Sequence, residues 1–199
     1  MIKKIHNLKF VIRNCQRGMT YVELIVVLSI FSIMTSIMLF NYKGFEAKEN
    51  IKILANDIAL KIVEAQKSSI SGKWNANAFS SWKPSYGVYF NLSNNKNFIY
   101  FADLNNNALY EDSGCTGECL EQISITKENS ISAIEIFGTG CPATVNNLNI
   151  IFKRPDSSAI ITSNPALLCS ISYVQIVISS PELISSTIKI YPSGRIQIN

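Results

Sequence analysis

The sequence has little of what most enzymes need for catalysis. Its 199 residues include a single histidine, His6, which lies in a basic N-terminal segment. A Ser-His-Asp or Cys-His arrangement in the rest of the chain would therefore lack its base. Glycine-rich phosphate-binding loops are missing too, because the run from Gly138 to Pro142 is too short and ends in proline. We predict that the protein is not an enzyme.

Acidic residues are absent from the first 22 positions, which gives the N-terminus a strong charge asymmetry. Five basic residues precede Gly18: Lys3, Lys4, Lys9, Arg13 and Arg17. In the run from Met19 to Phe40, Tyr21 and Glu23 are the only ionisable side chains. As a helix this run would be about 33 Å long, enough to cross a bilayer. The basic segment should stay in the cytoplasm, and the remainder of the chain should be exported.

The order of these segments argues against a secretory signal peptide. Such a peptide is cut after its apolar region, next to small residues. Here the candidate position, Gly18, comes before the apolar run, so cleavage would leave that run on the protein. The sequence thus predicts a leader over residues 1–18, followed by a processed and membrane-anchored subunit.

The segment from Arg17 to Leu24 resembles the N-terminus of type IV pilins. Precursors in that family carry a short basic leader ending in Gly, then a residue that becomes N-methylated, then a Glu at the fifth mature position. The resemblance implies that a prepilin peptidase cuts after Gly18, that Met19 is methylated and that Glu23 acts in assembly. Met19 replaces the usual Phe as an apolar variant. The resemblance also implies a methyltransferase, an inner-membrane assembly platform and other pilin-like subunits as partners.

Glu23 has a physical interpretation of its own. A carboxylate at the bilayer midplane costs roughly 2.5 to 3.5 kcal/mol, and less near the interface. Cleavage after Gly18 would create an α-amine four residues away, and by the resemblance Glu23 would neutralise this amine on a neighbouring subunit. The alternative is an interfacial Glu at the start of an ordinary, uncleaved signal anchor.

The apolar periodicity continues beyond the membrane segment. Apolar residues recur at steps of three and four, at Ile51, Leu54, Ile58, Ile62 and Ala65. We expect one long helix over residues 19–70, in which residues 19–40 span the membrane and residues 45–69 form an amphipathic half that packs on a sheet.

Residues 71–199 are expected to form one extracytoplasmic, β-rich domain. Nine short β-rich runs are separated by turns containing Asn, Gly, Pro and Ser. They cover 86–92, 97–102, 121–126, 133–137, 148–153, 159–162, 172–179, 187–191 and 195–198. The fold class is therefore α+β, similar to type IV pilins, with a long N-terminal helix packed on an antiparallel β-sheet domain. The last two runs flank Pro192–Gly194, which predicts a hairpin and resembles the C-terminal hairpin of minor pseudopilins of type II secretion and related minor pilins.

Four of the five cysteines lie on the exported side. Cys15 belongs to the leader, which leaves Cys115, Cys119, Cys141 and Cys169. An oxidising compartment favours two disulfides, for which three pairings exist. We favour Cys115 with Cys119 and Cys141 with Cys169, because the first pair is local within a glycine-containing loop. A structural zinc site is disfavoured, since neither paired C-x2-C knuckles nor a nearby His accompany these cysteines.

One loop has oxygen-bearing side chains at alternate positions, as calcium loops of the D-x-N-x-N kind do. The candidate ligands are Asp103, Asn105, Asn107, the Leu109 carbonyl, Glu111 and Asp112. Ala108 stands where such loops usually have Gly, and Gly114 stands where they usually have Glu. The alternative is an Asx-rich turn between strands, without metal. Calcium is the only cofactor the sequence suggests, and some pseudopilins use it in a β-region loop.

These features predict a minor pilin or pseudopilin of a type IV pilus or type II secretion-like filament. It would sit in the bacterial inner membrane as a single-pass protein with its C-terminal domain outside the cytoplasm, and then enter the filament. A first alternative is a minor pilin that binds DNA through Lys153, Arg154, Lys189 and Arg195. Beyond the leader, however, 13 basic face 14 acidic residues, which gives no gross basic field for nucleic acid. The second alternative is an uncleaved, signal-anchored surface protein.

Overall fold

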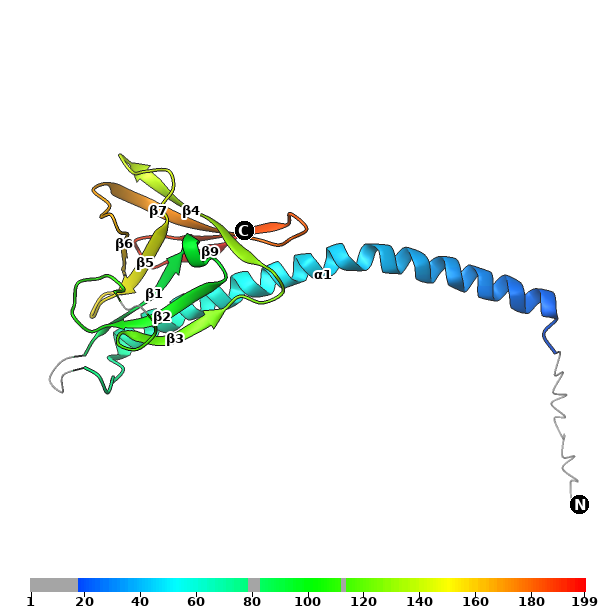
Figure 1. The fold of residues 1–199 in the computed structure, drawn as a ribbon, viewed down its shortest axis with the longest axis horizontal. Helices are drawn as coiled ribbons and strands as arrows, with labels where there is room; N and C mark the ends of the chain where they lie inside the picture. Colours follow the sequence, from blue (N-terminus) through cyan, green and yellow to red (C-terminus); the bar gives the residue numbers. More distant parts are fainter. Residues whose placement is uncertain (1–17, 79–82, 112–113) are drawn as a thin grey trace, which may run out of the picture. The chain divides into compact units, whose positions relative to one another are not determined.

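The computed structural model describes residues 18–78, 83–111 and 114–199. The leader, apart from Gly18, lies outside the described residues. The chain divides into two compact units, residues 1–43 and 44–199. One long helix, α1 (Tyr21–Ser71), contributes to both units (Figure 1).

The N-terminal part of α1 exposes its apolar side chains. From Met19 to Leu39, the large apolar side chains are between 44% (Leu24) and 77% (Tyr21) exposed. The hydroxyl groups of Ser29 and Thr35 donate hydrogen bonds to helix carbonyl oxygens, those of Val26 and Phe31, both at 2.8 Å. Because no polar group of these two side chains is left unpaired, they suit an apolar environment. α1 is the one helix among the described residues that is long and apolar enough to cross a membrane.

The second half of α1 buries the stripe that the periodicity predicts. Ile51, Ala55, Ile58, Ile62 and Ala65 are each no more than 1% exposed. They recur at three- and four-residue steps and therefore lie on one face of the helix. Leu54 lies at the edge of this stripe and is only partly buried.

The strands form two antiparallel sheets, and Figure 1 shows the second half of α1 running beside them. The larger sheet contains β1 (Ser85–Asn91), β2 (Asn97–Asp103), β3 (Cys119–Ser124), β5 (Asn147–Phe152) and β6 (Ala159–Thr162), in the order β3-β2-β1-β5-β6. The smaller sheet contains β4 (Ser130–Thr139), β7 (Ser170–Ser179), β8 (Ser185–Ile190) and β9 (Ile196–Ile198), in the order β4-β7-β8-β9. The short 3-10 helix η1 (Leu92–Asn94) links β1 to β2. The α+β fold predicted from the sequence is thus confirmed.

A single core joins the helix to both sheets. Val88 and Ile150 of the larger sheet and Ile176 and Ile188 of the smaller sheet are fully buried in the same cluster as the helix stripe. Alternate residues of each strand point into this core, and the residues between them form the outer faces of the sheets. Those outer faces carry the surface chemistry of the domain.

The hairpin predicted at the C-terminal end is formed by β8 and β9, with Ile188 opposite Ile198. Gly194 takes a φ of +82° in its turn, a conformation that favours glycine. The hairpin is tied to the helix, because Nε2 of Gln66 donates hydrogen bonds to the carbonyl oxygens of Ser157 at 2.8 Å and Gly194 at 3.4 Å.

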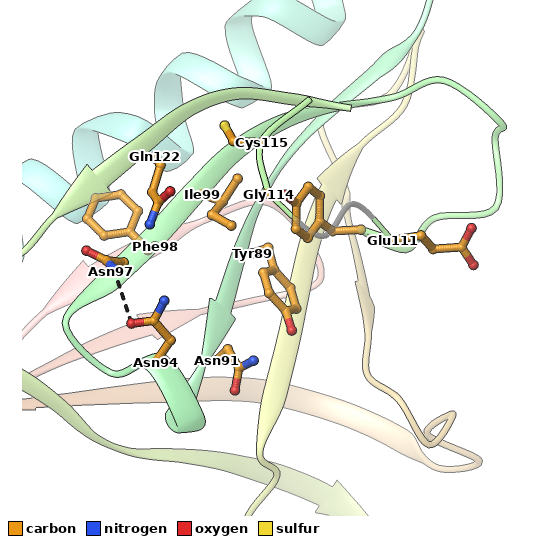
Figure 2. A pocket seen from close by; sticks show the side chains of 11 residues that line it. Tyr89, Asn91, Asn94, Asn97, Phe98, Ile99, Glu111, Gly114, Cys115 and Gln122 are labelled. Carbon is orange, nitrogen blue, oxygen red and sulfur yellow. Dashed lines mark hydrogen bonds between the residues drawn. The ribbon is translucent and has the colours of Figure 1, made fainter. Parts of the chain in front are cut away.

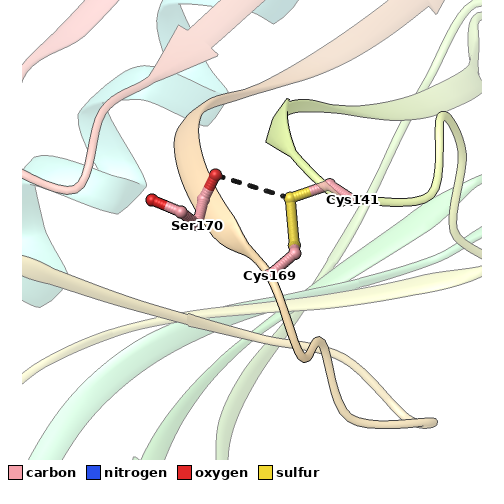
Figure 3. The surroundings of a disulfide bond; sticks show 3 residues. All are labelled: Cys141, Cys169 and Ser170. Carbon is pink, nitrogen blue, oxygen red and sulfur yellow. Dashed lines mark hydrogen bonds between the residues drawn. A yellow bond between two sulfur atoms is a disulfide. The ribbon is translucent and has the colours of Figure 1, made fainter.

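The cysteines pair as the sequence analysis favours. Cys115 is bonded to Cys119, with a Cα–Cα distance of 4.6 Å, and Cys141 to Cys169, at 5.0 Å. Both distances lie in the usual range for disulfides. The second bond joins the end of β4 to the start of β7, and Sγ of Cys141 lies 3.6 Å from the Ser170 carbonyl oxygen (Figure 3).

Candidate functional site

The expected cleavage bond lies in an exposed, non-helical segment. Gly18, Met19 and Thr20 precede the first turn of α1 and are all exposed. A Cβ atom on Gly18 would meet no atom within 4 Å. Packing in this fold therefore does not require glycine at position 18, and a requirement for it would come from an enzyme that cuts there.

Glu23 lies in the first helical turn, where its backbone N–H donates to Oγ1 of Thr20 at 3.3 Å. Thr20 and Glu23 have the spacing of a capping box, which stabilises the start of a helix. A carboxylate in the first turn also interacts favourably with the helix dipole. Glu23 is exposed and forms no ion pair within the described part of the chain.

The loop after β2 folds over the outer face of the larger sheet. Asp103, only 2% exposed, accepts hydrogen bonds from the backbone N–H groups of Asn107 at 3.2 Å and Ala108 at 3.1 Å. The side-chain oxygen of Asn105 accepts from Asn107 at 3.1 Å, and that of Asn107 accepts from the amide of Leu109 at 2.8 Å. The loop therefore has the Asx turns that its composition favours.

The remaining predicted calcium ligands come near the end of this loop. Oε2 of Glu111 accepts from Nδ2 of Asn105 at 3.1 Å, and Asp112 lies outside the described residues. Ala108 adopts a φ of +59°, so an alanine occupies the left-handed conformation for which such loops usually use glycine.

Glu118 is a buried carboxyl group that sequence reasoning missed. It is 9% exposed, its Oε1 accepts from the backbone N–H of Leu104 at 3.0 Å, and its Oε2 is buried without a hydrogen-bond partner in the described structure. Burial raises the pKa of Glu118, the Leu104 hydrogen bond partly offsets this rise, and the charge of Asp103 adds to it. No sequence pattern signals this pair, because β2 and β3 must pair before Glu118 comes near Asp103.

The outer face of the smaller sheet carries an aromatic ladder with two cations. The rings of Phe137 and Tyr173 stack with centroids 4.5 Å apart, and Tyr191 lies 5.6 Å from Tyr173. Nζ of Lys189 lies 5.2 Å from the Tyr173 ring centre, and the Arg195 guanidinium lies 4.0 Å from that of Tyr191. The structure thus brings together two of the four basic residues proposed from the sequence.

The other two basic candidates, Lys153 and Arg154, lie in the connection between β5 and β6. The Arg154 side chain is close to Gly72, since a Cβ atom there would lie 2.6 Å from Nη1 of Arg154. Arg154 therefore packs near the end of α1.

A known family model matches this chain at its N-terminus. Residues 13–39 match the family model described as the prokaryotic N-terminal methylation motif. No curated protein matches the chain, and no solved structure does. This motif supports a prepilin-processed protein, and the long N-terminal helix with its antiparallel sheets is consistent with a type IV pilin-like fold. Residues 13–39 thus carry the N-terminal motif of type IV pilin-like precursors, which are structural proteins that a prepilin peptidase processes and that assemble with other pilin subunits.

Proposed function

We propose that this protein is a minor pilin or pseudopilin of a type IV pilus or type II secretion-like filament. The peptidase cuts between Gly18 and Met19 and a methyltransferase modifies the new amine. The subunit then stays in the inner membrane, on the assembly platform, with residues 71–199 outside the cytoplasm. The observation that carries this proposal is the exposed apolar part of α1 directly after the expected cleavage bond.

The same helix surface serves both stages of this function. Apolar side chains contribute about 25 cal/mol per Å² when they leave water. In the membrane this surface is already away from water, so its transfer into a filament depends on packing between helices rather than on further dehydration. Glu23 then acts through its pairing with the amine of an adjoining subunit.

Mass spectrometry of the protein extracted from membranes of its host tests processing directly. We expect a chain that begins at methylated Met19. A Gly18→Val variant should retain residues 1–18, whereas Gly44→Val, a matched change beyond the motif, should be processed normally. An intact N-terminus on the native protein would reject the proposal and favour the uncleaved surface anchor.

DNA binding is a second candidate, supported by the placement of Lys189 and Arg195 on one sheet face. Against it, both cations already lie over tyrosine rings. Gel shifts of the full chain with single- and double-stranded DNA should show binding that weakens with salt and is lost in Lys189→Ala/Arg195→Ala. A lack of shift at low salt would reject this function.

Calcium binding by the loop over residues 103–112 remains a prediction. The amides of Asn107, Ala108 and Leu109 already satisfy oxygens of the loop, so an ion is not needed to close it. Oε2 of Glu118, beside Asp103, is a buried oxygen without a hydrogen-bond partner in the described structure. Addition of calcium chloride should raise the unfolding temperature of the wild-type protein and not that of Asp103→Asn.

A further inference from the structure

We propose that a pocket on the outer face of the larger sheet binds a neutral saccharide. The pocket has a volume of about 370 Å³ and lies where β1, β2 and β3 meet the loop that follows β2 (Figure 2). This volume is within the range of small-ligand sites and is large enough for one or two sugar rings. None of the described residues that line the pocket belongs to the processing segment or to α1, so the proposal is independent of the assembly function.

Four carboxamide side chains line the pocket, those of Asn91, Asn94, Asn97 and Gln122. Each carboxamide offers both a donor and an acceptor, and this matches hydroxyl groups, which also donate and accept. A ligand with several adjacent hydroxyl groups can therefore satisfy several of them at once.

Two of these carboxamides are held in place by each other. Nδ2 of Asn97 donates to Oδ1 of Asn94 at 3.1 Å, as Figure 2 shows. This bond leaves Oδ1 of Asn97 and Nδ2 of Asn94 for a ligand. Oδ1 of Asn91 accepts from the backbone N–H of Ser93 at 2.8 Å, which fixes that side chain as well. Such ordering before binding lowers its entropic cost.

The apolar part of the pocket complements these polar groups. Tyr89 and Tyr110 lie with ring centroids 5.0 Å apart, and Ile99 lies beside them on β2. Sugar rings have apolar C–H faces that pack on aromatic rings, while their hydroxyl groups point sideways. The combination of tyrosine rings and carboxamides therefore suits a saccharide better than a purely apolar ligand.

The charge of the pocket selects against anions. Among the described residues that line it there is no Lys or Arg, and Glu111 is the only charged side chain. Phosphate, sulfate and carboxylate ligands need cationic or amide N–H donors to offset their charge, and Glu111 would repel them. We therefore expect the ligand to be uncharged.

Calorimetric titration of the full chain tests this proposal, in a micelle of lauryldimethylamine oxide, a detergent without sugar. The probes are maltotriose, cellotriose and chitotriose, with sialyllactose as the charged comparison. We expect binding of at least one neutral trisaccharide and none of sialyllactose. Gln122→Ala and Asn97→Ala should each weaken this binding by about 3- to 10-fold, the effect of one lost neutral hydrogen bond.

Gln197→Ala is the matched control, because Gln197 is also an exposed glutamine on a strand, in the smaller sheet. It should bind as the wild type does. The proposal is overturned if no neutral trisaccharide binds, if sialyllactose binds instead, or if Gln122→Ala and Gln197→Ala behave alike. Gln122 is exposed, so its variant keeps the test valid even if Asn97→Ala fails to fold.

Discussion

Glu23 lies in the first turn of α1 and has a proposed role in assembly, and different measurements can separate the two. Its backbone N–H is bonded to Thr20, so the start of α1 does not depend on its carboxylate alone. We predict that Glu23→Ala still inserts into the membrane, while its amount in filaments falls severalfold, because the subunit loses the partner for a neighbouring amine. Immunoblots of membrane and sheared filament fractions measure both. Glu46→Ala, an exposed carboxylate of the same helix outside the motif, should enter filaments normally; equal loss in both variants would contradict the role of Glu23.

Glu118 should make the stability of the domain depend on pH. Its folded pKa lies above the usual value, so the folded state holds this proton more tightly than the unfolded state. Stability from this group is therefore full below the unfolded pKa and decreases as pH rises through the folded pKa.

We predict that Glu118→Gln raises the unfolding temperature at pH 7 and that the gain shrinks toward pH 4. Thermal unfolding followed by circular dichroism between these pH values measures it. Glu182→Gln, at an exposed position, should leave the curve unchanged. A gain that is equal at both ends of the range would show that the Glu118 charge is not the cause.

At the level of single residues, the sequence predicts a role for positions whose signal comes from their neighbours along the chain. Gly18, Met19 and Glu23 could be proposed because they follow one another along the chain. Glu118 could not, because its burial beside Asp103 arises only when β2 and β3 pair. The pocket carboxamides were missed for the same reason, since Gln122 is far along the chain from Asn91.

At the level of elements, the buried stripe of α1 should dominate the stability of the domain. Ile58→Ala removes a fully buried side chain between helix and sheets, and we predict a loss of about 2 to 5 kcal/mol in the free energy of unfolding. Ile53 is the same residue type at 55% exposure, so Ile53→Ala should cost about 0.5 kcal/mol or less. Urea unfolding of both variants in lauryldimethylamine oxide micelles measures this difference. Similar losses in both variants would contradict the assignment of Ile58 to the buried face of α1 and of Ile53 to its exposed face.

A side chain at Gly194 should destabilise the β8–β9 turn. A Cβ atom there would lie 2.1 Å from the Ser157 carbonyl oxygen, in addition to the strain of a φ of +82°. We predict that Gly194→Ala lowers the free energy of unfolding by about 1 to 3 kcal/mol.

Gly140 separates these two effects, because its φ is +75° but a Cβ atom would meet nothing within 4 Å. Gly140→Ala should therefore cost about 1 kcal/mol from backbone strain alone. Chemical unfolding of the two variants compares them. If both variants lose the same free energy of unfolding, the close approach of the hairpin to Ser157 does not contribute to the cost of a side chain at Gly194.

Much of the element pattern could be predicted from the sequence. The helix expected over residues 19–70 is Tyr21–Ser71, and the run expected at 159–162 is β6 with the same bounds. Alternation and turn residues are local signals, which explains this agreement. The division of the strands into sheets of five and four was not predictable, because strands of both sheets show the same alternation and only long-range pairing separates them.

At the level of the whole molecule, the two disulfides should contribute unequally. Cross-links stabilise mainly by restricting the unfolded chain, and the effect grows with the length of the closed loop. The sequence separation is 28 for Cys141–Cys169 and 4 for Cys115–Cys119. We predict that replacing Cys141 and Cys169 together by Ser costs about 2 to 4 kcal/mol, and that the same change at Cys115 and Cys119 costs less. Thermal unfolding under oxidising conditions tests this order, and the reverse order would contradict it.

The position of Cys141–Cys169 has a consequence for how this disulfide forms, given the proposed export of the domain. β4 and β7 pair over nine positions, and the last of them, Thr139 with Ser170, lies directly beside the two cysteines. Strand pairing alone therefore brings the thiols of Cys141 and Cys169 together before an oxidase joins them. Oxidation would then stabilise a domain that is already folded. A subunit in a reducing medium would keep its strand order, but its free energy of unfolding would be lower.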